Sequence, residues 1–124
     1  MSSSQRPISP HLQIYRPQIT SIMSISHRLT GVILSSSLLL LAVMLTCLVK
    51  GPEVYAHFLF YSQHTLSKIY LFVLSYSFYY HLCNGVRHLF WDMGYGFKMS
   101  EVRLSGYLTL GVSALLTLMT WFMV

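Results

Sequence analysis

Two histidines, a glycine and an aspartate recur at helical spacing in the second half of the chain. His81, Gly85, His88 and Asp92 fall at i, i+4, i+7 and i+11, so on a helix they share one face. An imidazole inside a membrane helix is costly unless it binds a partner or a metal. Because a glycine lets a flat group lie close to the backbone, this face suggests a prosthetic group, with haem as the first candidate. The alternative is that His81 bonds a neighbouring helix and Gly85 only lets that helix pack close.

If His81 is an axial ligand of a haem iron, the second ligand comes from another helix. His81 and His88 are seven residues apart, about 10 Å along a helix, so they cannot both bind one iron. His27 is expected near the membrane interface, and His57 and His64 on the other side. The second ligand is therefore expected from a second membrane subunit. His88 then contacts a haem propionate or caps the helix end.

A second polar face precedes the first long apolar run. Ser24, His27, Arg28 and Gly31 fall at i, i+3, i+4 and i+7. A hydroxyl and a guanidinium near the membrane boundary suit a quinone head group, because fixed donors stabilise the negative charge that reduction places on its oxygens. The alternatives are a serine bonded to its own helix and an arginine extended to the lipid headgroups.

Two charged residues lie on the same segment as His81. Arg87 is open to the same two interpretations as Arg28, either pairing with a propionate or other ligand or extending to the headgroups. Asp92 could relay protons, but we expect it to pair with Arg87 or His88.

The composition excludes most soluble classes of protein. Of 124 residues, 54% are hydrophobic and 9% are charged, against about a quarter charged in soluble domains. The chain is therefore expected to be an all-α integral membrane protein. The net charge of +5 is an orientation signal, and nucleic-acid binding is not expected because no basic run is interleaved with aromatic residues. Cys47 and Cys83 lie in apolar segments and are expected to act as small hydrophobic residues.

Three transmembrane helices are predicted, at approximately residues 26–49, 68–90 and 105–124. They form one domain, 21–124, after a proline-punctuated arm at 1–20. Lys50-Gly51-Pro52 should end the first span, the aromatic connector 53–67 should lie at the interface with a helical turn, and Gly94 and Gly96 should make a turn.

The basic residues predict an orientation. The excess lies on the N-terminal side and in the second connector, which are therefore expected on the cytoplasmic or matrix side, with the C-terminus opposite. These residues are Arg6, Arg16, Arg28, Arg87, Lys98 and Arg103, against Lys50 and Lys68 beside the first connector. The polar groups of the first two spans then converge near one interface, with His81 nearly two turns deeper.

Two stretches resemble the signatures of a known family, the cytochrome b subunit of succinate dehydrogenase (respiratory complex II). The first comprises residues 6–15 followed by Ser24-Ile25-Ser26-His27-Arg28-Leu29-Thr30-Gly31. The second runs from His81 through Gly85-Val86-Arg87-His88-Leu89 to Trp91-Asp92. The resemblance covers nearly the whole chain, and the motifs occur in the family's order.

The resemblance implies a haem b-binding membrane anchor within a larger enzyme. Its partners would be a flavoprotein subunit, an iron–sulfur subunit and a second small membrane anchor, with ubiquinone as the electron acceptor and lipid around the helices. By the resemblance, His81 is the axial haem ligand, shared with the second membrane subunit, and Ser24 and Arg28 bind quinone. His27, Arg28 and His88 are implied as haem propionate contacts. The chain would be a non-autonomous enzyme subunit without a succinate-oxidising site.

Two other functions remain open at this point. One is the anchor of a fumarate reductase, which runs electrons in the other direction, and the other is a haem-free structural anchor. The first residues lack a signal or transit peptide pattern, which favours a bacterial inner membrane. A chain encoded inside a mitochondrion would look the same, so the mitochondrial inner membrane is the alternative.

Overall fold

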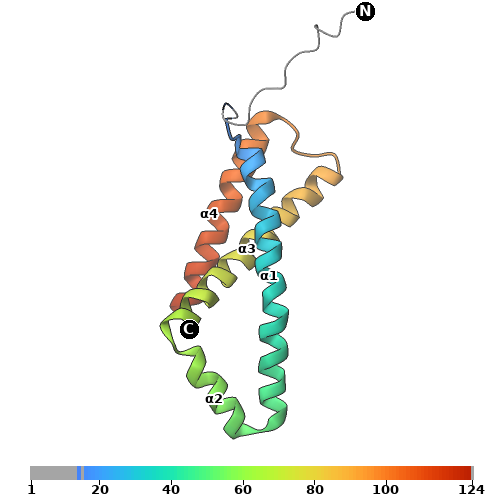
Figure 1. Ribbon diagram of the computed structural model, residues 1–124. Coiled ribbons are helices and arrows are strands. Elements are labelled where there is room, and N and C mark those ends of the chain that lie inside the picture. The colour runs from blue at the N-terminus through green and yellow to red at the C-terminus, as the bar shows by residue number, and fades with distance from the viewer. Residues whose placement is uncertain (1–13, 15, 124) are drawn as a thin grey trace, which may run out of the picture.

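The computed structural model describes Ile14 and residues 16–123, so most of the predicted N-terminal arm lies outside the described residues. The described part is helical, as predicted. Its elements are α1 (Ile19–Lys50), α2 (Pro52–Ser62), α3 (Thr65–Asp92) and α4 (Met99–Met123) (Figure 1).

Glycines break the helices where the sequence predicts breaks. Gly51 has a φ of 114°, a backbone conformation that residues with a Cβ rarely adopt. Pro52 then begins α2, at a position where the N–H that proline lacks would have no partner within the helix. Gly94 and Gly96 also have positive φ, and the Trp91 indole closes their turn by donating to the Gly96 carbonyl at 3.1 Å. The first connector differs from expectation, because most of it forms the eleven-residue helix α2.

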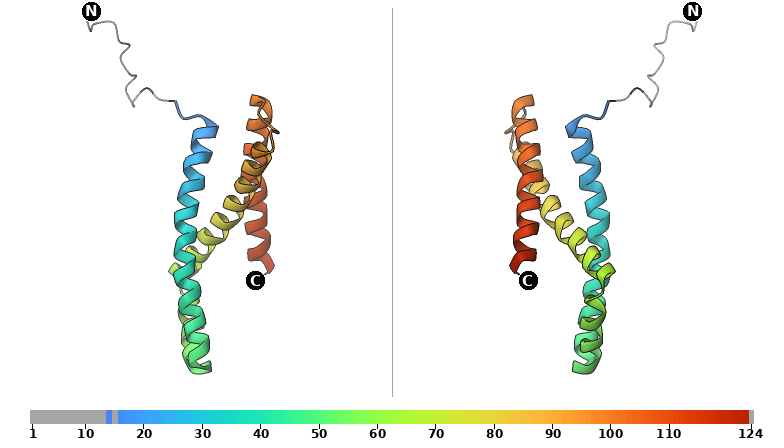
Figure 2. Two further views of the ribbon diagram at one scale, coloured as in Figure 1. Left: turned by 90° about the vertical axis from the view of Figure 1, so that its right-hand side faces the viewer. Right: turned by 90° about the vertical axis from the view of Figure 1, so that its left-hand side faces the viewer.

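The three long helices are arranged around an oblique α3. Figure 2 shows α3 running from beside α1 to beside α4, while α1 and α4 point the same way. The start of α1 and the α3–α4 turn lie at one end of the molecule, and the α1–α2 turn lies at the other (Figure 1). The structure therefore places the two predicted polar regions at the same end.

The polarity of the packing is the reverse of that in a soluble protein. Only Met23, Tyr80 and Val102 are buried apolar side chains among the described residues. The buried polar ones are Thr30, Ser77, Asn84, Arg87, Thr109, Ser113 and Thr117. Large apolar side chains face outward instead; Leu39 and Val49, for example, are 72% and 86% exposed. Small and polar residues between helices, with apolar residues outside, are typical of packing in lipid.

Small residues let the helices approach closely. Thr109, Ser113 and Thr117 recur every fourth residue on α4 and are buried, and the Thr117 hydroxyl donates to the Ser113 carbonyl of its own helix at 2.8 Å. A Cβ on Gly106 would lie 2.8 Å from the sulfur of Met23, so this glycine permits the contact between α1 and α4. The C-terminal helix is thus a packing helix, as its sequence indicates.

Two of the three predicted spans have a composition suited to a membrane. Within the described residues, α1 and α4 are long and apolar enough to cross a bilayer. α3 has 28 residues, but it is less apolar because its inward face carries polar side chains such as Asn84 and Arg87. The structure therefore gives two candidate spans where the sequence predicts three.

Candidate functional site

A cluster of three histidines joins α1 to α3. The rings of His27 and His81 stack with centroids 3.8 Å apart and planes inclined by 11°. The His88 ring lies 5.4 Å from that of His27, at 59°. Three of the predicted site residues, from two segments far apart in the sequence, thus meet in one place.

Gly31 makes this contact possible. A Cβ on Gly31 would lie 3.2 Å from Cε1 of His81, which is tighter than most real contacts. Gly85, in contrast, faces open space, with nothing within 4 Å of its added Cβ. The sequence predicts Gly85 as the glycine that makes room for a group. For Gly31 the sequence predicts only that it shares a helical face with His27. That spacing is the one sequence signal for its contact with His81.

The polar atoms of the stacked rings have different environments. Nδ1 of His81 lies 3.1 Å from the backbone carbonyl oxygen of His27. Because a carbonyl oxygen can only accept, Nδ1 carries the proton and Nε2 keeps its lone pair. Nδ1 of His27 is buried and has no hydrogen-bond partner among the described residues.

Ser24 and Arg28 lie beside the cluster, at its end of the molecule. They are one turn apart on α1, next to the face that carries His27 and Gly31. Ser24 is half-buried and Arg28 is exposed. Within the described part of the chain, the Arg28 guanidinium makes no hydrogen bond or ion pair.

Arg87 occupies an environment that the sequence does not predict. It is only 6% exposed and lies between α3 and α4. Its Nε donates to Ser105 Oγ at 2.9 Å, and one terminal nitrogen donates to the Val102 carbonyl at 3.0 Å. The guanidinium carbon also lies 4.1 Å from the centroid of the Trp91 ring. This burial contradicts the expected extension of Arg87 to the headgroups, while its expected pairing with a ligand stays a prediction.

Asn84 connects this arginine to the histidine cluster. The other terminal nitrogen of Arg87 donates to Asn84 Oδ1 at 3.3 Å, which turns the amide nitrogen of Asn84 toward His88 Nε2 at 3.4 Å. Asn84 is fully buried. The expected pairing of Asp92 with Arg87 or His88 does not occur. Asp92 is exposed, and the ion pair that the structure shows within residues 16–123 is Lys98–Glu101.

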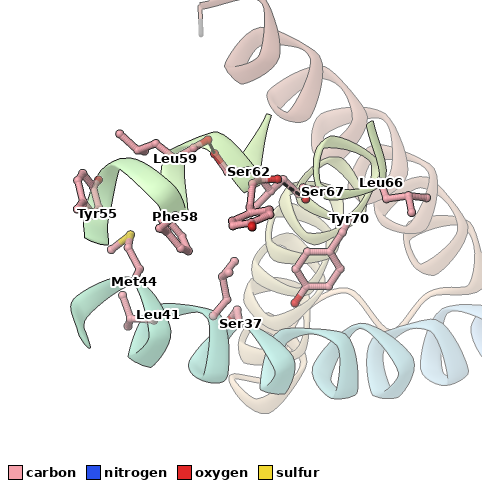
Figure 3. A pocket seen from close by; sticks show the side chains of 13 residues that line it. Ser37, Leu41, Met44, Tyr55, Phe58, Leu59, Ser62, Leu66, Ser67 and Tyr70 are labelled. Atoms are coloured by element: carbon pink, nitrogen blue, oxygen red, sulfur yellow. Dashed lines mark hydrogen bonds between the residues drawn. The ribbon is translucent and has the colours of Figure 1, made fainter. Parts of the chain in front are cut away.

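A cavity of about 860 Å³ lies away from the histidines, between α1, α2 and α3 (Figure 3). Apolar side chains line most of it, among them Leu41, Met44 and Phe58, with hydroxyls from residues such as Tyr70. It contains none of the residues predicted for the site and no charged side chain. The cluster of His27, His81 and His88 is therefore the better candidate site, although the large cavity lies elsewhere.

The described residues hold no group of three or more His, Cys, Asp or Glu side chains arranged to bind a metal ion by themselves.

Comparison with known proteins identifies the family of the chain. A family model described as the Succinate dehydrogenase/Fumarate reductase transmembrane subunit matches residues 2–120. The chain belongs to this family.

Individual relatives of this transmembrane subunit agree over nearly the full length. The succinate dehydrogenase cytochrome b556 subunit of Rickettsia felis is 46% identical over 118 residues, covering 95% of this chain and 92% of the relative. The succinate dehydrogenase cytochrome b560 subunit of Reclinomonas americana is 42% identical over 122 residues, covering 94% and 84%. The cytochrome b556 subunit of Paracoccus denitrificans is 34% identical over 120 residues, covering 97% and 92%.

Proposed function

We propose that the chain is the haem b-binding membrane anchor of a succinate dehydrogenase, passing electrons from an iron–sulfur subunit to ubiquinone. A flavoprotein subunit would oxidise succinate, and a second small subunit would complete the membrane part. The observation that carries the proposal is the contact between Nδ1 of His81 and the carbonyl of His27 at 3.1 Å. This contact leaves Nε2 of His81 as the atom that can bind iron. A relative of the chain is named as a cytochrome b556 subunit, which agrees with a haem ligand.

The residues around His81 fit a haem. Gly85, one turn further along α3, opens to free space, and the buried Nδ1 of His27 has no partner among the described residues. A bound haem supplies a one-electron carrier. His27 cannot be the opposite axial ligand, because its ring lies face to face with that of His81 at 3.8 Å and leaves no space for an iron between them. The second ligand is therefore assigned to the partner membrane subunit.

Ser24 and Arg28 are the proposed quinone-binding residues. The hydroxyl of Ser24 would donate to a carbonyl oxygen of the head group, and the Arg28 guanidinium would face the negative charge that reduction creates. Arg28 and His27 would also meet the haem propionates. His88 is a weaker propionate contact, because Asn84 already engages its Nε2 at 3.4 Å.

Three helices cross the membrane in this proposal. With 28 residues, α3 is about 42 Å long, which exceeds a hydrocarbon core of about 30 Å. Its buried polar side chains, Ser77, Asn84 and Arg87, lie between the helices, so they do not oppose insertion once the helices are packed. The excess of basic residues supports placing the start of α1 on the cytoplasmic or matrix side of an inner membrane in this proposal.

The proposal predicts a defined composition for the purified complex. When the complex is isolated through this chain, a reduced-minus-oxidised visible spectrum should show a low-spin b-type haem. Mass spectrometry should find a flavoprotein and an iron–sulfur protein beside it. A b-type spectrum without these partners would move the chain to another cytochrome system, and partners without haem would leave only a structural anchor.

Arg28→Ala should separate quinone reduction from succinate oxidation. Loss of the guanidinium should reduce quinone reductase activity roughly tenfold or more, because a donor to developing negative charge is removed. Oxidation of succinate by an artificial acceptor should be unchanged. Arg103→Ala is the matched control, since Arg103 is also exposed and near the same end of the bundle. Equal loss of both activities would indicate an assembly defect and count against the quinone role.

The family description also includes fumarate reductase. The relatives named above favour succinate dehydrogenase, since each is named for that enzyme.

A further inference from the structure

The Nδ1 atom of His81 has two oxygen neighbours on α1. Besides the His27 carbonyl at 3.1 Å, the hydroxyl of Thr30 lies 3.1 Å away. The same hydroxyl lies 2.9 Å from the His27 carbonyl and donates to it. Each of these three polar atoms thus lies within hydrogen-bond distance of the other two, at the contact between α1 and α3.

Of the two neutral tautomers of His81, only the one protonated at Nδ1 satisfies this set of atoms. The carbonyl oxygen accepts from both Nδ1–H and the Thr30 hydroxyl, and the hydroxyl oxygen offers a lone pair to Nδ1–H. If Nδ1 were unprotonated, its lone pair would face the carbonyl lone pairs at 3.1 Å, which is repulsive. The pair of oxygens therefore selects the tautomer in which Nε2 is free to bind a metal.

We propose that Thr30 is a positioning residue for His81, giving Nδ1–H a second acceptor and holding the ring orientation that a haem ligand needs. This inference rests on the proposed function, since it assumes that His81 binds the iron. Hydrogen-bond acceptors on the far nitrogen of a ligand histidine raise its basicity and fix its orientation, and they contribute substantially to metal affinity.

A hydrogen bond within its own helix alone would not require this placement of Thr30. Many helix threonines bond their own backbone, as Thr46 does with the Ala42 carbonyl at 2.7 Å, and Thr46 is exposed. Thr30 makes such a bond too, but it is only 7% exposed and reaches across to the other helix. Thr46 therefore serves as a control for loss of a local bond alone.

The test uses Thr30→Val, which removes the hydroxyl and nearly keeps the volume, in the purified complex. Haem retention should weaken by about tenfold. The haem midpoint potential should rise, because a less basic histidine stabilises the oxidised iron less. Thr30→Ser should restore both properties, and Thr46→Val should change neither. The readouts are haem per complex, a redox titration of the visible spectrum, and the electron paramagnetic resonance of the oxidised haem.

Unchanged haem content, potential and resonance in Thr30→Val would overturn the proposal. If Thr30→Val does not assemble, Thr30→Ala removes the hydroxyl without placing a methyl group at its position, although it also removes the γ-methyl of threonine. A Thr30→Ser variant as impaired as Thr30→Val would also overturn it, because the hydroxyl would then not be the group that acts. His81→Ala distinguishes this failure from that of the proposed function, since haem retained in His81→Ala would remove the ligand assignment itself.

Discussion

Replacing His81 with alanine should abolish haem binding in the assembled complex. Its Nε2 is the proposed ligand atom, and the His27 ring stacks on the His81 ring at 3.8 Å, so it occupies a different position from the ligand ring. In the proposed site the remaining ligand would come from the partner subunit, and that ligand alone should hold the haem weakly. We expect haem per complex to fall to near zero in the visible spectrum, with the other subunits still present.

His57→Ala is the matched control for this experiment. His57 is exposed on α2, at the other end of α1 from the histidine cluster, so its replacement should leave the spectrum unchanged. His88→Ala should also retain haem, because Asn84 occupies one of its nitrogens. A full haem spectrum in the purified His81→Ala complex would show that the ligand lies elsewhere.

Arg87→Met should destabilise the packing of α3 against α4. The change removes three hydrogen bonds, to Ser105, Val102 and Asn84, together with the contact to the Trp91 ring. A buried acceptor left without a partner costs about 1–3 kcal/mol. Removing the guanidinium also removes the desolvation cost of burying it, so we expect a net loss on the order of 2 kcal/mol and not the sum of the bonds.

The measurement is the thermal midpoint for dissociation of the complex in detergent. Arg87→Lys should recover only part of the loss, because an ammonium group cannot reach three acceptors with the geometry of a planar guanidinium. Arg103→Met is the control for loss of an exposed arginine from the same pair of helices. Equal or greater stability in Arg87→Met would mean that burying the guanidinium outweighs its hydrogen bonds.

Local features of the fold were predictable because they depend on near neighbours in the chain. The end of α1 at Lys50 follows from Gly51 and Pro52, and the turn before α4 follows from Gly94 and Gly96. The full helix α2 was harder to predict, because aromatic residues such as Tyr55 and Phe58 suit both a helix and an interfacial loop.

The candidate site was predictable only in part. Helical spacing identified the faces of His27 and His81, but not that their rings stack on each other. Arg87 shows the limit most clearly. Its acceptors Val102 and Ser105 lie 15 and 18 residues away, beyond a turn, and no spacing rule connects them. The position of Arg87 near a predicted boundary instead favoured headgroups or a ligand.

The buried guanidinium has a consequence for how the chain enters a membrane. A helix that carries Asn84 and Arg87 on one face partitions poorly into lipid by itself, because their polar groups would lack the partners that α4 supplies. The acceptors that satisfy Arg87 are synthesised next, at the start of α4, after the short connector 93–98. α3 is therefore expected to leave the translocation machinery together with α4, as a hairpin. The chain would insert as one independent helix followed by one coupled pair.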